Sequence, residues 1–133
     1  MSKYKKVNQK IVDELTEIVG DRFIIYNDEN KLETFSHDEI AEEKYASMPE
    51  VVVKPGSAEE IASIMKLANK ENVAVTPRGA GSGLSGGAVP LYGGIVLSLE
   101  RMDKILEIDR ENLMAVVEPG VVTNEINELI EDD

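Results

Sequence analysis

The segment VVVKPGSAEEIASIMKLANKENVAVT, residues 51–76, carries the pattern that decides the fold. It begins with three valines, which predict a strand buried on both faces, and ends with a second apolar run from Val73 to Thr76, which predicts another strand. Between the runs, Ser57 is followed three residues later by Glu60, a capping box that predicts a helix over 57–71. The segment therefore predicts a β-α-β unit with a right-handed crossover.

The residues after this unit predict further strands and a final helix. A third strand is expected over 95–99, followed by a hairpin whose strands cover 105–108 and 113–117. Glu118-Pro119-Gly120 predicts a turn, and apolar residues at helical spacing then predict a helix over 122–131.

The residues before the unit predict a helix and a less regular stretch. Apolar residues at helical spacing indicate a helix over 6–19 with Gly20 as its C-cap, and 23–26 indicate a short strand. The charged stretch 27–48 is expected to be irregular. We therefore predict a lead-in at 1–48 and an α/β (α+β) unit at 49–133, with a small, mostly parallel sheet of three or four strands flanked by helices.

Composition excludes several classes of function. Lys and Arg total 14 against 26 Asp and Glu, a formal charge of −12, which disfavours nucleic acid and anionic membranes as partners. The chain has no Cys and a single His, so disulfides, thiol chemistry and a His-rich metal site are excluded. No apolar run reaches the length of a membrane span, and the basic N-terminus lacks the apolar core of a signal peptide, so a cytoplasmic location is expected.

The glycine-rich segment that follows the predicted second strand indicates an anion site. Seven of the ten glycines lie between Gly79 and Gly94, and Arg78 is the only charged residue from Thr76 to Leu99. Glycine lets successive backbone amides converge on one anion, whereas carboxylates would repel it. The alternative is a flexible surface loop, which would more often be polar and charged throughout.

Two familiar phosphate motifs do not fit this segment. Gly81-x-Gly83-x-x-Gly86 matches the dinucleotide fingerprint as a string, but that fingerprint needs a helix that begins at the loop. Here Pro90 and a glycine pair follow, without a helical pattern. A P-loop is excluded because no Lys follows the last glycine. The segment is therefore expected to bind phosphate through backbone amides between two strands.

Pro77-Arg78-Gly79-Ala80-Gly81-Ser82-Gly83-Leu84-Ser85-Gly86-Gly87-Ala88 resembles the pyrophosphate loop of the FAD-linked oxidases of the vanillyl-alcohol oxidase and p-cresol methylhydroxylase superfamily. The flanks agree: the strand and helix start from Pro49 to Glu60, and the turn at 118–121, are similar to that family's. The nearest branch contains the FAD subunit of glycolate oxidase and the D-lactate dehydrogenases.

The resemblance implies a set of residues that bind FAD, and no catalytic residue in this chain. The implied cofactor-binding residues are Pro77, Arg78, Gly79, Ala80, Gly81, Ser82, Gly83, Leu84, Ser85, Gly86 and Gly87. Two roles are open for Arg78: it offsets diphosphate charge, or it pairs with the acidic surface. Ser82 stands where a His would carry covalent flavin in some members, so non-covalent FAD is implied.

The resemblance also implies a reaction and a larger protein. FAD would accept a hydride from the α-carbon of a 2-hydroxy acid, giving a 2-oxo acid, and electrons would pass to a protein or quinone acceptor. Members are several times longer, so this chain is expected to be an N-terminal fragment, inactive alone, that lacks the rest of the p-cresol methylhydroxylase-type FAD-binding domain and the substrate cap domain. The alternatives are another FAD branch, such as an enolpyruvyl reductase or an alkyl-glycerone-phosphate synthase, and a non-enzymatic phosphate-binding module.

The single histidine, His37, invites a catalytic interpretation, but a lone His in a charged loop is usually solvated. Asp38 is given no chemical role. The acidic run from Asp38 to Lys44 is expected to be a solvated face.

Overall fold

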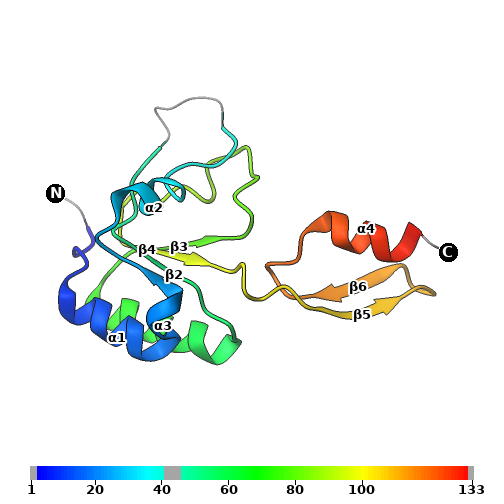
Figure 1. Ribbon diagram of the computed structural model, residues 1–133, viewed down its shortest axis with the longest axis horizontal. Helices are drawn as coiled ribbons and strands as arrows, with labels where there is room; N and C mark the ends of the chain where they lie inside the picture. Colours follow the sequence, from blue (N-terminus) through cyan, green and yellow to red (C-terminus); the bar gives the residue numbers. More distant parts are fainter. Residues whose placement is uncertain (1–2, 41–45, 132–133) are drawn as a thin grey trace.

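The computed structural model describes residues 3–40 and 46–131, which form two lobes (Figure 1). The sheet lobe, residues 3–102, is built on four strands in the order β1-β2-β4-β3. These strands are β1 (Ile24–Ile25), β2 (Val51–Val53), β3 (Val75–Arg78) and β4 (Ile95–Ser98). The strands β2, β4 and β3 are parallel and β1 is antiparallel to β2, so the predicted α/β class with a small, mostly parallel sheet is confirmed.

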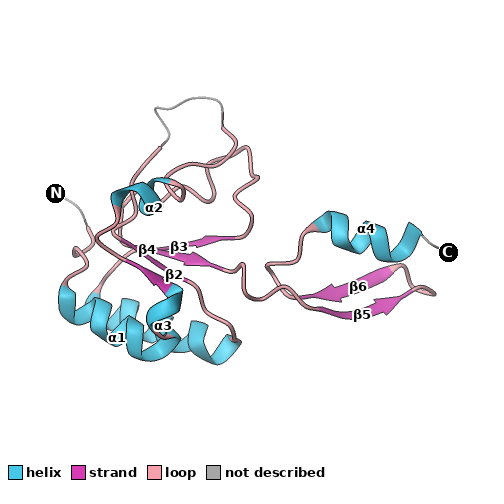
Figure 2. Cartoon of the chain, viewed as in Figure 1, coloured by secondary structure: helices cyan, strands magenta, loops and turns pink. Residues whose placement is uncertain are grey.

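Helices cover both faces of this sheet (Figures 1 and 2). On one face lie α1 (Gln9–Val19) and α3 (Ala58–Glu71), and Ile11, Leu15 and Ile64 join the strand residues in one buried cluster. On the other face α2 (Glu29–Glu33) places Leu32 against Val52 and Val96 of the sheet. Because both faces are covered, every residue of β2 and β4 is buried, as the valine run predicted for β2.

Local capping explains where the long helices begin and end. The Asn8 side chain accepts a hydrogen bond from the amide of Ile11 at the start of α1, and Gly20 ends that helix with φ +87°. Ser57 accepts from the amide of Glu60 at 3.2 Å, while the Glu60 carboxylate accepts from the amide of Gly56 at 2.7 Å. The capping box therefore starts α3 where predicted. The Glu60 carboxylate, however, accepts from the amide of Gly56 and not from that of the N-cap residue Ser57.

Two sequence-based expectations require correction. The second strand was predicted over 73–76 and lies over Val75–Arg78, because Asn72 ends α3 in the left-handed region and the amide of Val73 still bonds to Ala68 of the helix. The strand therefore includes Pro77, which an edge strand tolerates. The stretch 27–48 was predicted to be irregular but contains α2, whose five residues are too few to show a periodicity.

The C-terminal lobe, residues 105–131, consists of a hairpin and a helix. The predicted hairpin is confirmed, with β5 (Ile105–Asp109) antiparallel to β6 (Met114–Val117), and α4 (Thr123–Glu131) follows. Asn112 donates to both carboxylate oxygens of Asp109 across the turn, at 3.0 and 2.7 Å, and these hydrogen bonds lower the pKa of Asp109. The described helices include none with the length and apolar character needed to cross a lipid bilayer.

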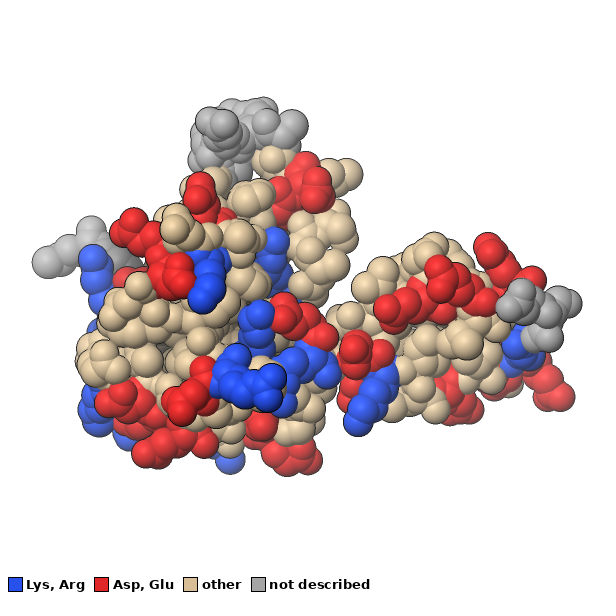
Figure 3. All heavy atoms as spheres, in the orientation of Figure 1, with Lys and Arg blue, Asp and Glu red and all other residues tan. Residues whose placement is uncertain are grey.

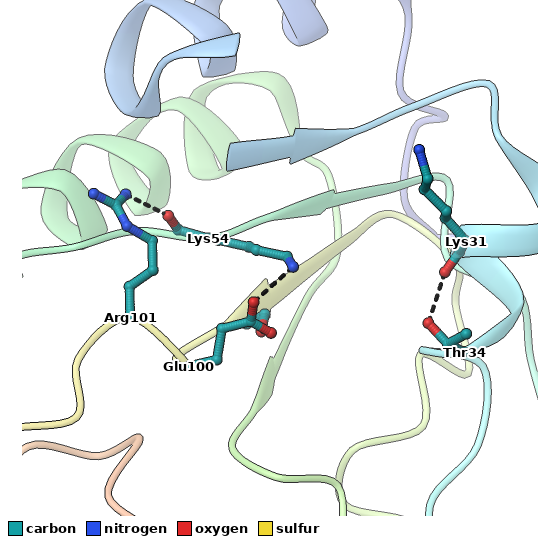
Figure 4. Close-up of polar contacts among 6 residues, drawn as sticks. Lys31, Thr34, Lys54, Glu100 and Arg101 are labelled. Atoms are coloured by element: carbon teal, nitrogen blue, oxygen red, sulfur yellow. Dashed lines mark hydrogen bonds and ion pairs between the residues drawn. The ribbon is translucent and has the colours of Figure 1, made fainter. Parts of the chain in front are cut away.

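Polar contacts fix the chain where it leaves β4 toward the C-terminal lobe (Figure 4). Arg101 donates to the carbonyl of Lys54 at 2.7 Å, and the Lys54 ammonium lies 2.6 Å from a carboxylate oxygen of Glu100. The Arg101 guanidinium also stacks on the ring of Phe23, 3.4 Å from its centroid. These contacts hold residues 99–102 beside the end of β2 and so set the direction in which the chain continues.

The C-terminal lobe exposes an apolar surface, from which we predict self-association. No described residue of α4 is buried, and a hollow of about 450 Å³ opens between the helix and the hairpin. The exposed large apolar side chains of this lobe are Leu106, Leu113, Met114, Val116, Val122, Leu129 and Ile130. Because exposed apolar side chains favour association, sedimentation velocity should show a mass that rises with concentration. Leu113→Glu combined with Ile130→Glu should lower that mass, and a monomer at every concentration would contradict the prediction.

Candidate functional site

The glycine-rich segment joins the carboxyl end of β3 to the start of β4 without forming a helix or strand. We call residues 79–88 the glycine loop. In Figure 1 it rises from the end of β3 on the side of the sheet that carries α2. Ligands of open α/β sheets commonly bind beyond the carboxyl ends of the strands, where this loop begins. The absence of a helix over 79–94, as predicted, removes the helix N-terminus on which the dinucleotide fingerprint depends.

The backbone amides of the glycine loop are the main hydrogen-bond donors of the site. Among the described residues, 3–40 and 46–131, the amides from Gly79 to Ser85 have no protein acceptor. Apart from Gly81 these residues are exposed, including the hydroxyl-bearing Ser82 and Ser85 and the Leu84 side chain. A run of unpaired amides that faces solvent matches the chemistry of an anion such as a diphosphate. Figure 3 shows acidic side chains spread over both lobes, in keeping with the formal charge of −12.

Gly81 is a position at which a side chain would strain the backbone and displace the side chain of Arg78. Its φ is +73°, in the left-handed region, and a Cβ there would collide with the guanidinium of Arg78. Gly83 lies outside that region, and its Cβ would meet only a carboxylate oxygen of Asp38 at 3.8 Å. A Cβ on Gly87 would meet open space. The sequence resemblance implies the same role for Gly81 and Gly83. In the structure they differ in φ and in the room for a Cβ.

The Arg78 side chain connects the edge strand to the segment after α2. Its guanidinium donates to the carbonyl of His37 at 2.6 Å and to that of Thr34 at 3.4 Å, and lies 5.6 Å from the centroid of the Phe35 ring. Burial lowers the pKa of Arg78, while the nearby carboxylate of Asp38 opposes that change. The group stays charged at any physiological pH, so a fixed positive charge lies at the start of the glycine loop.

Asp38 contradicts the expectation of a solvated acidic face. Only 5% of the residue is exposed, and its carboxylate accepts hydrogen bonds from the amide of Gly86 at 2.8 Å and of Ile40 at 3.0 Å. No local signal in the sequence reveals this contact, because Gly86 lies 48 positions further along the chain. Residues 41–44 of the predicted acidic face lie outside the described residues. The neighbouring His37 is exposed, with Nδ1 3.2 Å from the Ser36 hydroxyl.

The turn at 118–121 lies beside the first residue of the glycine loop. The amide of Val121 donates to the carbonyl of Glu118 at 3.2 Å, which confirms the predicted turn. The carbonyl oxygen of Pro119 lies 3.8 Å from where a Cβ on Gly79 would be. The two segments that the sequence resemblance singled out, 77–88 and 118–121, are therefore neighbours in space.

Comparison with known proteins yields a consistent set of relatives. The family described as FAD binding domain matches residues 49–133. The chain is 41% identical over 123 residues to a D-lactate dehydrogenase of Anaerostipes hadrus, covering 92% of this chain and 25% of the relative. It is 35% identical over 125 residues to the glycolate oxidase subunit GlcD of Bacillus subtilis, covering 94% and 26% respectively. The chain thus spans about a quarter of the length of these relatives.

A solved structure agrees with these sequence matches. The structure of p-cresol methylhydroxylase with substrate bound superposes with a TM-score of 0.83 and 26% sequence identity. The superposition covers 97% of this chain and 26% of that one.

Proposed function

Because this chain belongs to the FAD binding domain family, we propose that its glycine loop holds the pyrophosphate of FAD. The family match and the relatives confirm the resemblance drawn from the sequence, and with it FAD as the cofactor. The proposed FAD-binding residues remain Pro77, Arg78, Gly79, Ala80, Gly81, Ser82, Gly83, Leu84, Ser85, Gly86 and Gly87.

The observation that carries this proposal is the run of amides from Gly79 to Ser85 that lack a protein acceptor within the described residues. A diphosphate offers several anionic oxygens at one place, and hydrogen bonds from backbone amides to such oxygens are strong. The charge of Arg78 at the start of the loop favours the same ligand. The Gly86 amide is already bonded to Asp38, so we propose that Gly86 shapes the loop and does not donate to phosphate.

We propose that residues 49–133 form the first subdomain of the FAD-binding domain and that residues 1–48 are its lead-in. The family match begins at residue 49. The two parts share one core, since Ile11 and Leu15 of α1 pack in the same cluster as Val51 and Val53. The lead-in therefore supports the sheet from which the glycine loop extends.

For the complete protein we propose oxidation of a small 2-hydroxy acid to a 2-oxo acid, with electrons passed to a protein or quinone acceptor. The support is the identity to a D-lactate dehydrogenase and to a glycolate oxidase subunit. Bound FAD would supply the hydride acceptor. The residues of this chain would bind and orient the cofactor, and catalytic residues would lie outside it. We propose that binding is non-covalent, since the loop offers Ser82 and the chain has no Cys.

Anaerobic addition of substrate to the complete protein tests this reaction. D-lactate or glycolate should reduce the bound flavin and so bleach its visible absorbance. A yellow protein bleached by neither acid would favour another FAD-dependent branch. A colourless protein that binds ADP but not FAD would favour a phosphate-binding module.

The Ser82 hydroxyl should contribute modestly to FAD affinity. Ser82→Ala removes one exposed donor that could reach a phosphate oxygen, worth about 1.5–3 kcal/mol, or roughly a 10- to 150-fold rise in Kd. Fluorescence titration of the complete apoprotein with FAD measures this. Ser63→Ala is the control, because it removes an exposed hydroxyl that bonds to the carbonyl of Glu59 within α3, outside the loop. An unchanged Kd for Ser82→Ala would remove Ser82 from the site.

A further inference from the structure

The segment after α2 contacts the glycine loop at Gly83 and Gly86. We call residues 34–40 the brace segment. Arg78, before the loop, donates to the carbonyls of Thr34 and His37. Within the loop, the carbonyl of Gly83 accepts from the amide of Glu39 at 3.1 Å. The brace segment thus meets the strand end and the loop at successive points.

The last of these contacts is made by a buried carboxylate. Asp38 Oδ2 accepts from the amide of Gly86 at 2.8 Å, while Oδ1 accepts from the amide of Ile40 in its own segment. One side chain therefore links the backbone of the brace segment to the end of the loop. A hydrogen bond to a charged acceptor is about twice as strong as a neutral one, so this link is stiffer than a hydroxyl or an amide side chain would provide.

A carboxylate next to an anion site requires an explanation, because it would repel a phosphate. Here the charge of Asp38 is offset by Arg78 and by two amides that both point at it. The unpaired amides lie before Gly86, from Gly79 to Ser85. The Asp38 carboxylate therefore accepts from the Gly86 amide, and the amides of residues 79–85 remain available to a ligand.

We propose that Asp38 is a positioning residue for the cofactor loop: by bonding Gly86 to the brace segment, it holds the free amides of residues 79–85 in the arrangement that receives a diphosphate. The proposal rests on the proposed function. In the absence of Asp38 the loop samples other arrangements, and binding must then order it, which weakens affinity.

Three variants of the complete protein test this inference. Asp38→Ala removes both acceptors. Asp38→Asn keeps one acceptor oxygen but turns an NH₂ group toward an amide donor, so it restores part of the link. Glu39→Ala is the matched control, since it removes one negative charge at the next position, its side chain is exposed, and its backbone amide can still donate to Gly83.

The measurements are the Kd for FAD, the visible circular dichroism of bound FAD, and the melting temperature of the apoprotein. We expect Asp38→Ala to raise Kd about 10- to 100-fold, Asp38→Asn to lie between it and the parent, and Glu39→Ala to stay within about 2-fold. The dichroism of bound FAD should change in Asp38→Ala alone or most strongly. The melting temperature of the Asp38→Ala apoprotein should fall by several degrees, because two amides lose a buried acceptor, whereas that of Glu39→Ala should match the parent.

The inference is overturned if Asp38→Ala and Glu39→Ala bind FAD equally well, or if the loss of affinity disappears when binding is measured well below the melting temperature of the variant. Asp38→Asn replaces Asp38→Ala if that variant does not fold, since weaker FAD binding by the folded Asn variant supports the inference equally. Gly81→Val distinguishes the two proposals. If Gly81→Val binds FAD normally, the proposed function of the loop fails; if it does not bind while the Asp38 variants match the control, only the role of Asp38 fails.

Discussion

Gly81→Val should abolish FAD binding by the complete protein while its fold survives. With φ at +73°, any side chain at Gly81 strains the backbone by about 1–2 kcal/mol, and a β-branched one by more. The new Cβ would also collide with the Arg78 guanidinium and force it from the carbonyls of Thr34 and His37. The amides of the loop would then no longer converge on one anion.

The readout is flavin bound per protein after gel filtration, with far-ultraviolet circular dichroism as the folding control. Gly83→Ala is the matched contrast, because it adds a Cβ in the same loop at a position with ordinary φ and a nearest neighbour at 3.8 Å. We expect Gly83→Ala to keep most of its flavin. If Gly81→Val retained a full complement of flavin, the glycine loop would not be the pyrophosphate site.

Gly94→Ala should destabilise the sheet lobe more than any other single methyl added to the glycine-rich segment. Gly94 has φ +68°, and a Cβ there would collide with the carbonyl oxygen of Ala74. That same oxygen accepts the hydrogen bond from the amide of Ile95 that joins the chain before β3 to the start of β4. The methyl group therefore forces apart the two segments that lead into β3 and β4.

Gly93→Ala separates this clash from backbone strain. Gly93 has nearly the same φ, +66°, but its Cβ would meet only the Glu50 side chain, at 3.5 Å. We expect Gly93→Ala to lower the free energy of unfolding by about 1–2 kcal/mol and Gly94→Ala by about 3 kcal/mol or more. Urea denaturation of the 133-residue chain, followed by circular dichroism, measures both. Equal losses would show that the contact with Ala74 is relieved at little cost.

The strands, the long helices and the hairpin could be predicted because their signals are local. The valine run of β2 reflects burial on both faces, and the Ser57 cap sets the start of α3. The register of β3 could not be read in the same way. Val73 is apolar like a strand residue, but its amide bonds to the end of α3, so the strand starts two residues later.

The same distinction applies to the site. Composition and spacing alone predicted where an anion would bind, since glycine enrichment and the scarcity of charge from 76 to 99 are properties of one continuous segment. Only the tertiary structure showed which glycines of the loop adopt a left-handed φ and which side chains contact the loop. Asp38 and Gly86 are distant in sequence, and their contact exists because α2 covers the sheet on the side where the loop emerges. A contact of that kind depends on how separate elements pack, for which a single sequence carries no local pattern.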